Sequence, residues 1–130
     1  EVGTAASDFE FLPFDVNLLR CQRYYYLHAE GNAKSLGRGG YYSSSQAEYS
    51  LFPPVLMRAN PSLEIVTGTD YYVVYRNGGA DTLNSFSLNT ESTKEAVSML
   101  NNSQASGTAG HAGHFVTNNG SSKIALSSEL

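Results

Sequence analysis

Short runs of β-branched and aromatic residues, separated by glycine-rich and asparagine-rich turns, dominate the chain from residue 23 onwards. Such runs predict strands, because these side chains fill the pleated, half-buried surface of a sheet. The expected strands are 23–28, 41–51 (one or two strands), 63–67, 70–76, 83–88, 94–100, 114–117 and 123–126. Residues 91–99 could also form one helix by composition, but the strand-rich neighbouring sequence favours a strand.

Glycine, asparagine and proline mark the connections between these runs. Asn77-Gly78 lies between two apolar segments and predicts a tight hairpin, because both residues tolerate positive φ. Pro53-Pro54 rules out a central strand at that point, since proline cannot donate to a ladder. Residues Glu30–Gly40 and Asn101–Gly113 are expected to be long loops, and a turn at 118–120 is expected to close a final hairpin.

The first part of the chain differs from the rest. Residues 1–10 are mostly small and polar, and the aromatic residues that follow predict an extended entry segment docked on the domain. Asp15 is placed to cap a short helix that runs through Leu18, Leu19 and Cys21. About eight short strands and one short helix predict an all-β sandwich or barrel.

Composition narrows the class of protein further. The 130 residues, of 14.0 kDa, fit one domain, and only 15% of them are charged. The net charge of −4 and the absence of a basic run argue against nucleic-acid binding, and no apolar stretch approaches the ~18 residues of a membrane-inserted helix. A single cysteine excludes an internal disulfide. The start at Glu1, without a signal peptide, suggests a piece of a longer polypeptide.

The sequence gives little support for a catalytic site or a metal site. Cys21 and His28 could form a nucleophile–base pair, but no acidic residue stands at a spacing that suggests it orients the histidine. The favoured interpretation is therefore a half-buried structural thiol. His111 and His114 could share a metal ion, but no cysteine or carboxylate accompanies them, and a solvated loop is favoured. The acidic residues are scattered singly, which argues against a glycosidase pair. We therefore expect no enzyme activity, no cofactor and no metal.

Sugar binding fits the residue types better. Polysaccharide sites combine aromatic faces with amides, hydroxyls and a few charges. Arg38 with Tyr41 and Tyr42, and Arg76-Asn77 at the expected hairpin tip, offer these groups beside flexible loops. They are the candidate ligand-binding residues, although any one of these tyrosines could instead belong to the core or to a subunit interface.

Three sequence blocks resemble a known protein family. The first is Gly3-Thr4-Ala5-Ala6-Ser7-Asp8-Phe9-Glu10, and it is followed by Leu18-Leu19-Arg20-Cys21-Gln22-Arg23-Tyr24-Tyr25. The second is Pro54-Val55-Leu56-Met57-Arg58-Ala59-Asn60-Pro61, and the third is the terminal Ser128-Glu129-Leu130. In this order the blocks resemble those of the C-terminal modules of tailed-phage tail fibres and related virion structural proteins. Two departures are Ser7, in place of the usual threonine, and the lack of a basic residue and Gly-Glu pair within 11–17.

The resemblance implies a jelly-roll-like antiparallel β-sandwich that forms a homotrimer at the tip of a virion fibre. Residues 1–14 would then be a linker from upstream fibre domains, and 15–130 a receptor-binding and trimerisation domain. The expected function is host attachment through a bacterial surface polysaccharide or another receptor, with avidity from three copies. The alternative is a purely structural trimerisation, capping or capsid-decoration domain, and a glycan-cleaving enzyme ranks third.

Overall fold

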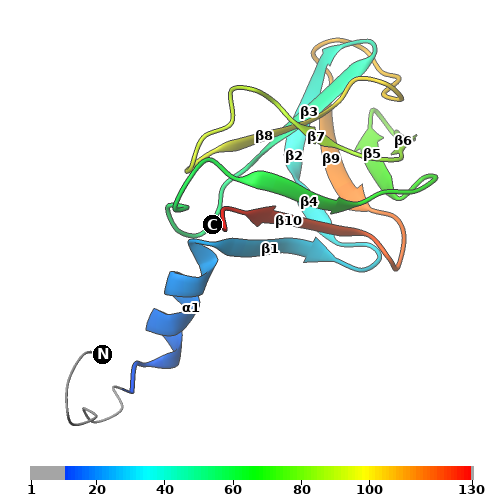
Figure 1. Ribbon diagram of the computed structural model, residues 1–130. Helices are drawn as coiled ribbons and strands as arrows, with labels where there is room; N and C mark the ends of the chain where they lie inside the picture. The colour runs from blue at the N-terminus through cyan, green and yellow to red at the C-terminus, as the bar shows by residue number, and fades with distance from the viewer. Residues whose placement is uncertain (1–10, 130) are drawn as a thin grey trace, which may run out of the picture.

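Ten strands and one helix are formed by residues 11–129, the part of the chain that the computed structural model describes (Figure 1). In chain order the elements are α1 (Phe14–Gln22), β1 (Tyr25–Glu30), β2 (Ser35–Ser43), β3 (Gln46–Leu51), β4 (Ser62–Val66), β5 (Tyr72–Arg76), β6 (Gly79–Leu83), β7 (Ser87–Leu88), β8 (Val97–Asn101), β9 (Ala112–Thr117) and β10 (Lys123–Ser127). The predicted linker, residues 1–14, lies mostly outside the described residues, as does the terminal Leu130.

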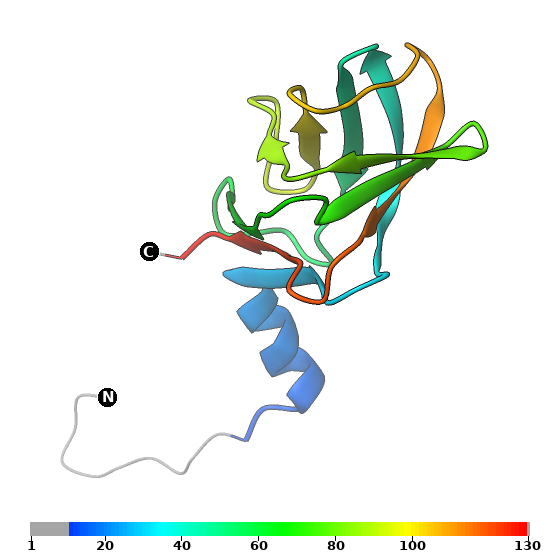
Figure 2. The same ribbon diagram turned by 90° about the vertical axis from the view of Figure 1, so that its right-hand side faces the viewer.

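The strands form two antiparallel sheets that face each other across the core (Figures 1 and 2). The smaller sheet has the order β1-β10-β4, and the larger one has the order β6-β5-β9-β2-β3-β8-β7. The chain alternates between the two sheets, so each contains strands from distant parts of the sequence. This arrangement confirms the predicted antiparallel β-sandwich with one short helix, with ten strands in the described residues rather than about eight.

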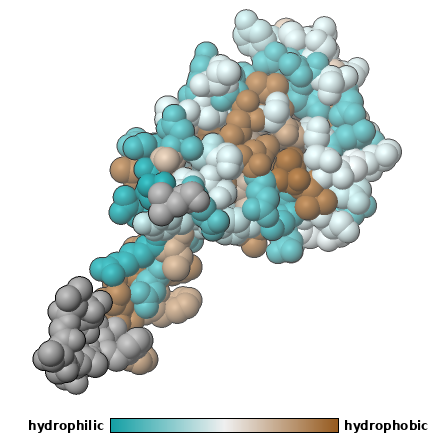
Figure 3. Space-filling model, in the orientation of Figure 1, coloured by the Kyte–Doolittle hydropathy of each residue, from teal (hydrophilic) through white to brown (hydrophobic). Residues whose placement is uncertain are grey.

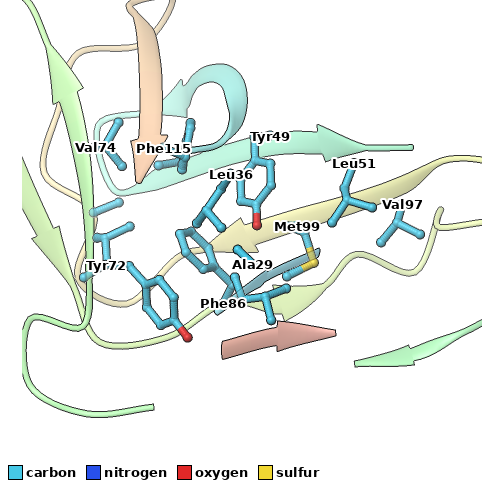
Figure 4. Close-up of a cluster of buried hydrophobic side chains, with 14 of the residues drawn as sticks. Ala29, Leu36, Tyr49, Leu51, Tyr72, Val74, Phe86, Val97, Met99 and Phe115 are labelled. Carbon is cyan, nitrogen blue, oxygen red and sulfur yellow. The ribbon is translucent and has the colours of Figure 1, made fainter. Parts of the chain in front are cut away.

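Aromatic rings fill the space between the sheets. Tyr49, Phe86 and Phe115 pack with centroid separations of 4.8–5.9 Å, and Tyr72 lies 5.1 Å from Phe86 (Figure 4). Tyr72 also ties the sheets together, because its hydroxyl donates to the Val66 carbonyl of β4 at 2.6 Å. Burying such large rings supplies most of the hydrophobic stabilisation of a small sandwich.

The expected loop at Glu30–Gly40 is instead largely strand. β2 begins at Ser35 and is the central strand of the larger sheet, flanked by β9 and β3. Its glycines permit close strand packing: a Cβ on Gly39 would lie 2.0 Å from the Glu48 carbonyl oxygen. Glycine at a close backbone approach and glycine in a loop look the same in a single sequence, which explains the error.

The final predicted hairpin is also wrong in its pairing. β9 and β10 are consecutive strands, but β9 pairs with β2 and β5, whereas β10 pairs with β1 and β4. The turn after β9 therefore carries the chain from one sheet to the other. Residues 94–100 do contribute a strand, β8, while the expected strand 83–88 is reduced to the end of β6 and the two residues of β7.

The helix lies outside the sandwich, at the end where β1 begins (Figures 1 and 2). Its N-cap is Pro13; Asp15 lies in the first turn instead of capping it, and its Oδ1 accepts from the Val16 amide at 2.9 Å. No residue of α1 is buried, and Phe14 is 80% exposed, so this aromatic does not dock on the domain as expected. Cys21 is exposed rather than half-buried. No helix among residues 11–129 has the length and apolar character needed to cross a membrane.

Candidate functional site

Two adjoining hollows lie on the outer face of the larger sheet and share Arg38. The first hollow has a volume of about 410 Å³ and the second about 540 Å³, both within the ~300–1,000 Å³ of small-molecule sites. The first is lined by Arg38, Gly39, Gly40, Tyr41, Tyr42, Glu48, Tyr49, Ser50, Ser98, Gly110, His111 and Ala112. The second is lined by Arg38, Tyr75, Arg76, Asn77, Gly78, Gly79, Ala80 and His114. A smaller depression joins the two across Gly39 and Gly113.

The alternation of side chains along β2 creates the first hollow. Arg38, Gly40 and Tyr42 share the outer face, because side chains of a strand alternate between its two faces. Gly40 carries no side chain, so the space between the two larger residues stays open. Four residues of strand separate Arg38 from Tyr42 by roughly 13 Å. An arginine and a tyrosine thus form opposite walls over a floor of backbone.

The register of the sheet places further side chains beside Arg38. Arg38 pairs with His114 of β9, and His114 pairs with Tyr75 of β5. This row runs across three strands, so Tyr75 lies roughly 10 Å from Arg38 at a strand spacing of about 4.8 Å. The row forms one side of the second hollow.

Three tyrosines among the described residues are exposed: Tyr24 at 43%, Tyr42 at 73% and Tyr75 at 51%, and of these Tyr42 and Tyr75 line the hollows. Tyr42 was among the predicted binding residues, and Tyr75 was not. The alternation within β5 points to Tyr75, because Tyr72 and Val74 face the core and the next residue must face outwards. Each hollow therefore has one exposed phenol ring.

Arg38 makes no hydrogen bond, ion pair or cation–π contact with any side chain or carbonyl among the described residues. It is exposed, with His114 and Ser50 on the neighbouring strands and Glu48 also in the lining of the first hollow. His114 is engaged with Ser35, whose Oγ lies 2.8 Å from its Nε2. The guanidinium of Arg38 is thus available for a ligand.

Tyr41, one of the candidate ligand-binding residues, has a buried side chain. It is 3% exposed, and its hydroxyl donates to Asp81 Oδ2 at 2.7 Å. Burial first, and the hydrogen bond to Asp81 second, raise the pKa of Tyr41 to about 12, so the phenol stays protonated and remains a donor. Tyr41 and Tyr42 point to opposite faces of β2, and of the two side chains Tyr42 is the one exposed to solvent.

The guanidinium of Arg76 is occupied by contacts within the protein. Its Nε donates to the Tyr41 hydroxyl at 3.1 Å, its Nη2 donates to the Ser106 carbonyl, and its guanidinium lies 5.3 Å from the Tyr41 ring centroid. Asp81 completes the network by accepting from the Ser106 amide at 2.8 Å. Arg76 is among the residues that line the second hollow, but its guanidinium is used to hold the loop 102–111 in place.

Asn77 lies at the tip of the hairpin between β5 and β6, as predicted. Its φ of 44° and the φ of 73° at Gly78 confirm the tight turn with two left-handed residues. Asn77 is exposed and lines the second hollow. The structure thus places Arg38, Tyr42 and Asn77 at the hollows as exposed residues, whereas the side chain of Arg76 binds the buried Tyr41.

The two histidines weighed as metal ligands lie in different hollows. His111 lines the first, where its Nδ1 is buried without a hydrogen-bond partner, and His114 lines the second. Within residues 11–129, no group of three or more His, Cys, Asp or Glu side chains is arranged to hold a metal ion.

Carboxylates are sparse around the hollows. Glu48 lines the first hollow, where its Oε2 accepts from Gln46 at 3.3 Å, and no acidic residue lines the second. The buried Asp81 is occupied by Tyr41 and Ser106. The described lining therefore offers one carboxylate, whereas glycosidases generally use a pair.

Comparison of the chain with protein-family models, curated proteins and solved structures finds no match.

Proposed function

We propose that this chain is a non-enzymatic, receptor-binding module of a phage virion. In this proposal it forms the tip of a tail fibre as a trimer and attaches to a glycan on the host cell surface. The observation that carries the proposal is the pair of hollows around Arg38, each with an exposed tyrosine. Aromatic faces stack on sugar rings, and the surrounding hydroxyl, amide and guanidinium groups can hydrogen-bond to sugar hydroxyls.

The shape of the hollows supports binding of a chain rather than of a compact molecule. They are open and adjoin one another along the face of the sheet, with Tyr42 on one side of Arg38 and Tyr75 on the other. An extended saccharide could contact both rings at once. A rigid sheet holds the rings in place, so little ordering entropy is lost on binding.

A second candidate function has its own support. The exposed Phe14 and Leu18 give one side of α1 an apolar surface, and brown atoms are visible over the helix in Figure 3. Exposed apolar residues of this kind fit contact between copies of the chain. A module whose whole role is trimerisation or capping would need this surface and would have no use for the hollows.

Binding of labelled protein to intact bacterial cells separates the two functions. Receptor binding predicts attachment to some strains, loss of attachment after periodate oxidation of surface sugars, and resistance to protease treatment of the cells. Tyr42→Ala and Tyr75→Ala should each weaken attachment, since each removes a stacking face worth about 1 kcal/mol.

Phe52→Ala is the matched control, because Phe52 is 68% exposed but lines neither hollow. It should leave attachment unchanged. Failure to bind any strain across a broad panel would favour the structural function. If Phe52→Ala and Tyr42→Ala weaken attachment to cells equally, the hollows are not the binding site.

A further inference from the structure

We propose that the receptor is an acidic saccharide, and that its anionic group, a carboxylate or a phosphate, binds the guanidinium of Arg38. This inference rests on the proposed function and adds the chemical class of the ligand. It starts from the state of Arg38, which is exposed at the junction of the two hollows and has no partner among the described residues.

The charge around the second hollow favours an anion. Arg38 lines it with an exposed side chain, His114 and Arg76 are among its other lining residues, and no aspartate or glutamate lines it. The whole chain has a net charge of −4, so a hollow with an exposed arginine and no carboxylate differs in charge from the rest of the protein. An exposed guanidinium in a hollow without carboxylates raises the local concentration of anionic ligands.

Arg38 suits this role because of its geometry. Its planar guanidinium can bind a carboxylate or phosphate with two parallel hydrogen bonds, which fixes orientation as well as adding energy. Arg76 cannot do this, because its Nε and Nη2 already donate to Tyr41 and Ser106. Arg38 therefore makes the contact with the anion, while Arg76 stays bound to Tyr41 and Ser106.

The tyrosines place the rest of the saccharide. With the anionic group on Arg38, a ring on the second-hollow side lies near Tyr75, and the neighbouring sugar on the first-hollow side approaches Tyr42. Glu48 lies on this first-hollow side only, so the sugar there is expected to be uncharged. The saccharide would therefore present an acidic sugar beside a neutral one.

The test uses surface polysaccharide purified from a strain to which the protein binds. Three forms are compared: native, carboxyl-reduced, and stripped of phosphate with hydrofluoric acid. Affinity should fall about tenfold or more on removal of one of the two groups, and the form that loses affinity identifies the anion. Arg38→Gln should lower the affinity for native polymer to that measured for the neutralised one, and Arg38→Lys should give an intermediate value.

Arg20→Gln is the control, because it removes one exposed positive charge on α1, away from the hollows. It should bind like the parent protein. Thermal melts verify that each variant is folded, as expected for an exposed side chain without contacts. Undiminished affinity for both neutralised polymers would overturn the anionic ligand and leave glycan binding standing. Absence of binding to every purified polysaccharide, with cell binding retained, would overturn glycan recognition itself.

Discussion

Tyr41 and Tyr42 are adjacent in the chain and have opposite roles. Tyr41 points inwards and joins Asp81 to Arg76, whereas Tyr42 points outwards and forms a wall of the first hollow. The difference follows from the two-residue period of a strand, which sends neighbours to opposite faces. Substitutions at the two positions should therefore separate stability from binding.

Tyr41→Phe should lower the free energy of unfolding by about 1–3 kcal/mol, because it leaves the buried Asp81 carboxylate without one of its donors. Tyr42→Ala should change stability by less than about 0.5 kcal/mol, as expected for an exposed side chain. Urea titration of both variants measures this contrast. A loss at Tyr42 as large as that at Tyr41 would contradict the assignment of the two faces.

His28 makes the stability of the sandwich depend on pH. Its Nε2 lies 2.6 Å from the Leu36 carbonyl oxygen, which requires a proton on Nε2, and its Nδ1 lies 3.4 Å from the Tyr26 hydroxyl. Burial lowers the pKa of His28 below 6.5, outweighing the hydrogen bond to Leu36, which raises it. The neutral imidazole therefore links β1 of one sheet to β2 of the other.

Because the folded state favours neutral His28, its contribution to stability is present above pH 6.5 and is lost as pH falls towards the lowered pKa. Urea titrations at steps from about pH 7.5 to about pH 5 should show a falling free energy of unfolding. His28→Gln keeps a donor for the Leu36 carbonyl but does not titrate, so its profile should be flatter. His111 and His114 are present in both proteins and cancel in the comparison. If the free energy of unfolding falls equally with pH in the parent protein and in His28→Gln, other groups cause the pH dependence.

At the scale of elements, the strands of the sandwich were largely predictable and their partners were not. The runs around β4 and β5 have the β-branched and aromatic residues that favour a strand, whereas the run around β8 also fitted a helix by composition. The pairing of β9 and β10 with strands from opposite sheets depends on contacts between distant residues, which a turn signal cannot reveal. The same holds for the hollows, because Arg38 and Tyr75 come together only through β9.

The hairpin between β5 and β6 offers a test of local backbone chemistry. Gly78 has a φ of 73°, and no atom lies within 4 Å of the position that a Cβ would take there. Gly78→Ala should therefore lower the free energy of unfolding by about 1 kcal/mol through backbone strain alone.

Gly120 is the matched control for that substitution. A Cβ at Gly120 would also meet no atom within 4 Å, and its φ is not in the left-handed region. Gly120→Ala should leave stability nearly unchanged in the same urea titration. Equal effects of the two substitutions would mean that the left-handed conformation at Gly78 costs alanine nothing measurable.

At the scale of the whole molecule, the proposed receptor surface and the proposed contact between copies lie on separate parts of the chain. The hollows are built on the larger sheet, while α1 extends from the end of the sandwich where β1 begins (Figures 1 and 2). Self-association through α1 would therefore leave the hollows open in every copy. Several weak sites on one assembly can then bind a repetitive polysaccharide with high avidity.

Association through α1 is itself open to test. Phe14, Leu18 and Cys21 follow at spacings of four and three residues, which places them on one side of the helix, and Phe14 and Leu18 are 80% and 44% exposed. Phe14→Glu with Leu18→Glu should convert the proposed trimer to a monomer, because charges at these positions cannot be buried between copies.

Sedimentation velocity at micromolar concentration measures this change. Arg20→Gln, on another side of the same helix, should sediment like the parent protein, since 20 is displaced by about 120° from the Phe14–Leu18–Cys21 side at 3.6 residues per turn. The monomeric variant should keep its melting temperature, because no residue of α1 is buried in the sandwich. It should also keep its affinity for a short saccharide while losing avidity for whole cells. A parent protein that already sediments as a single chain would refute the trimer, and a trimer that survives both substitutions would move the contact to a surface of the sandwich.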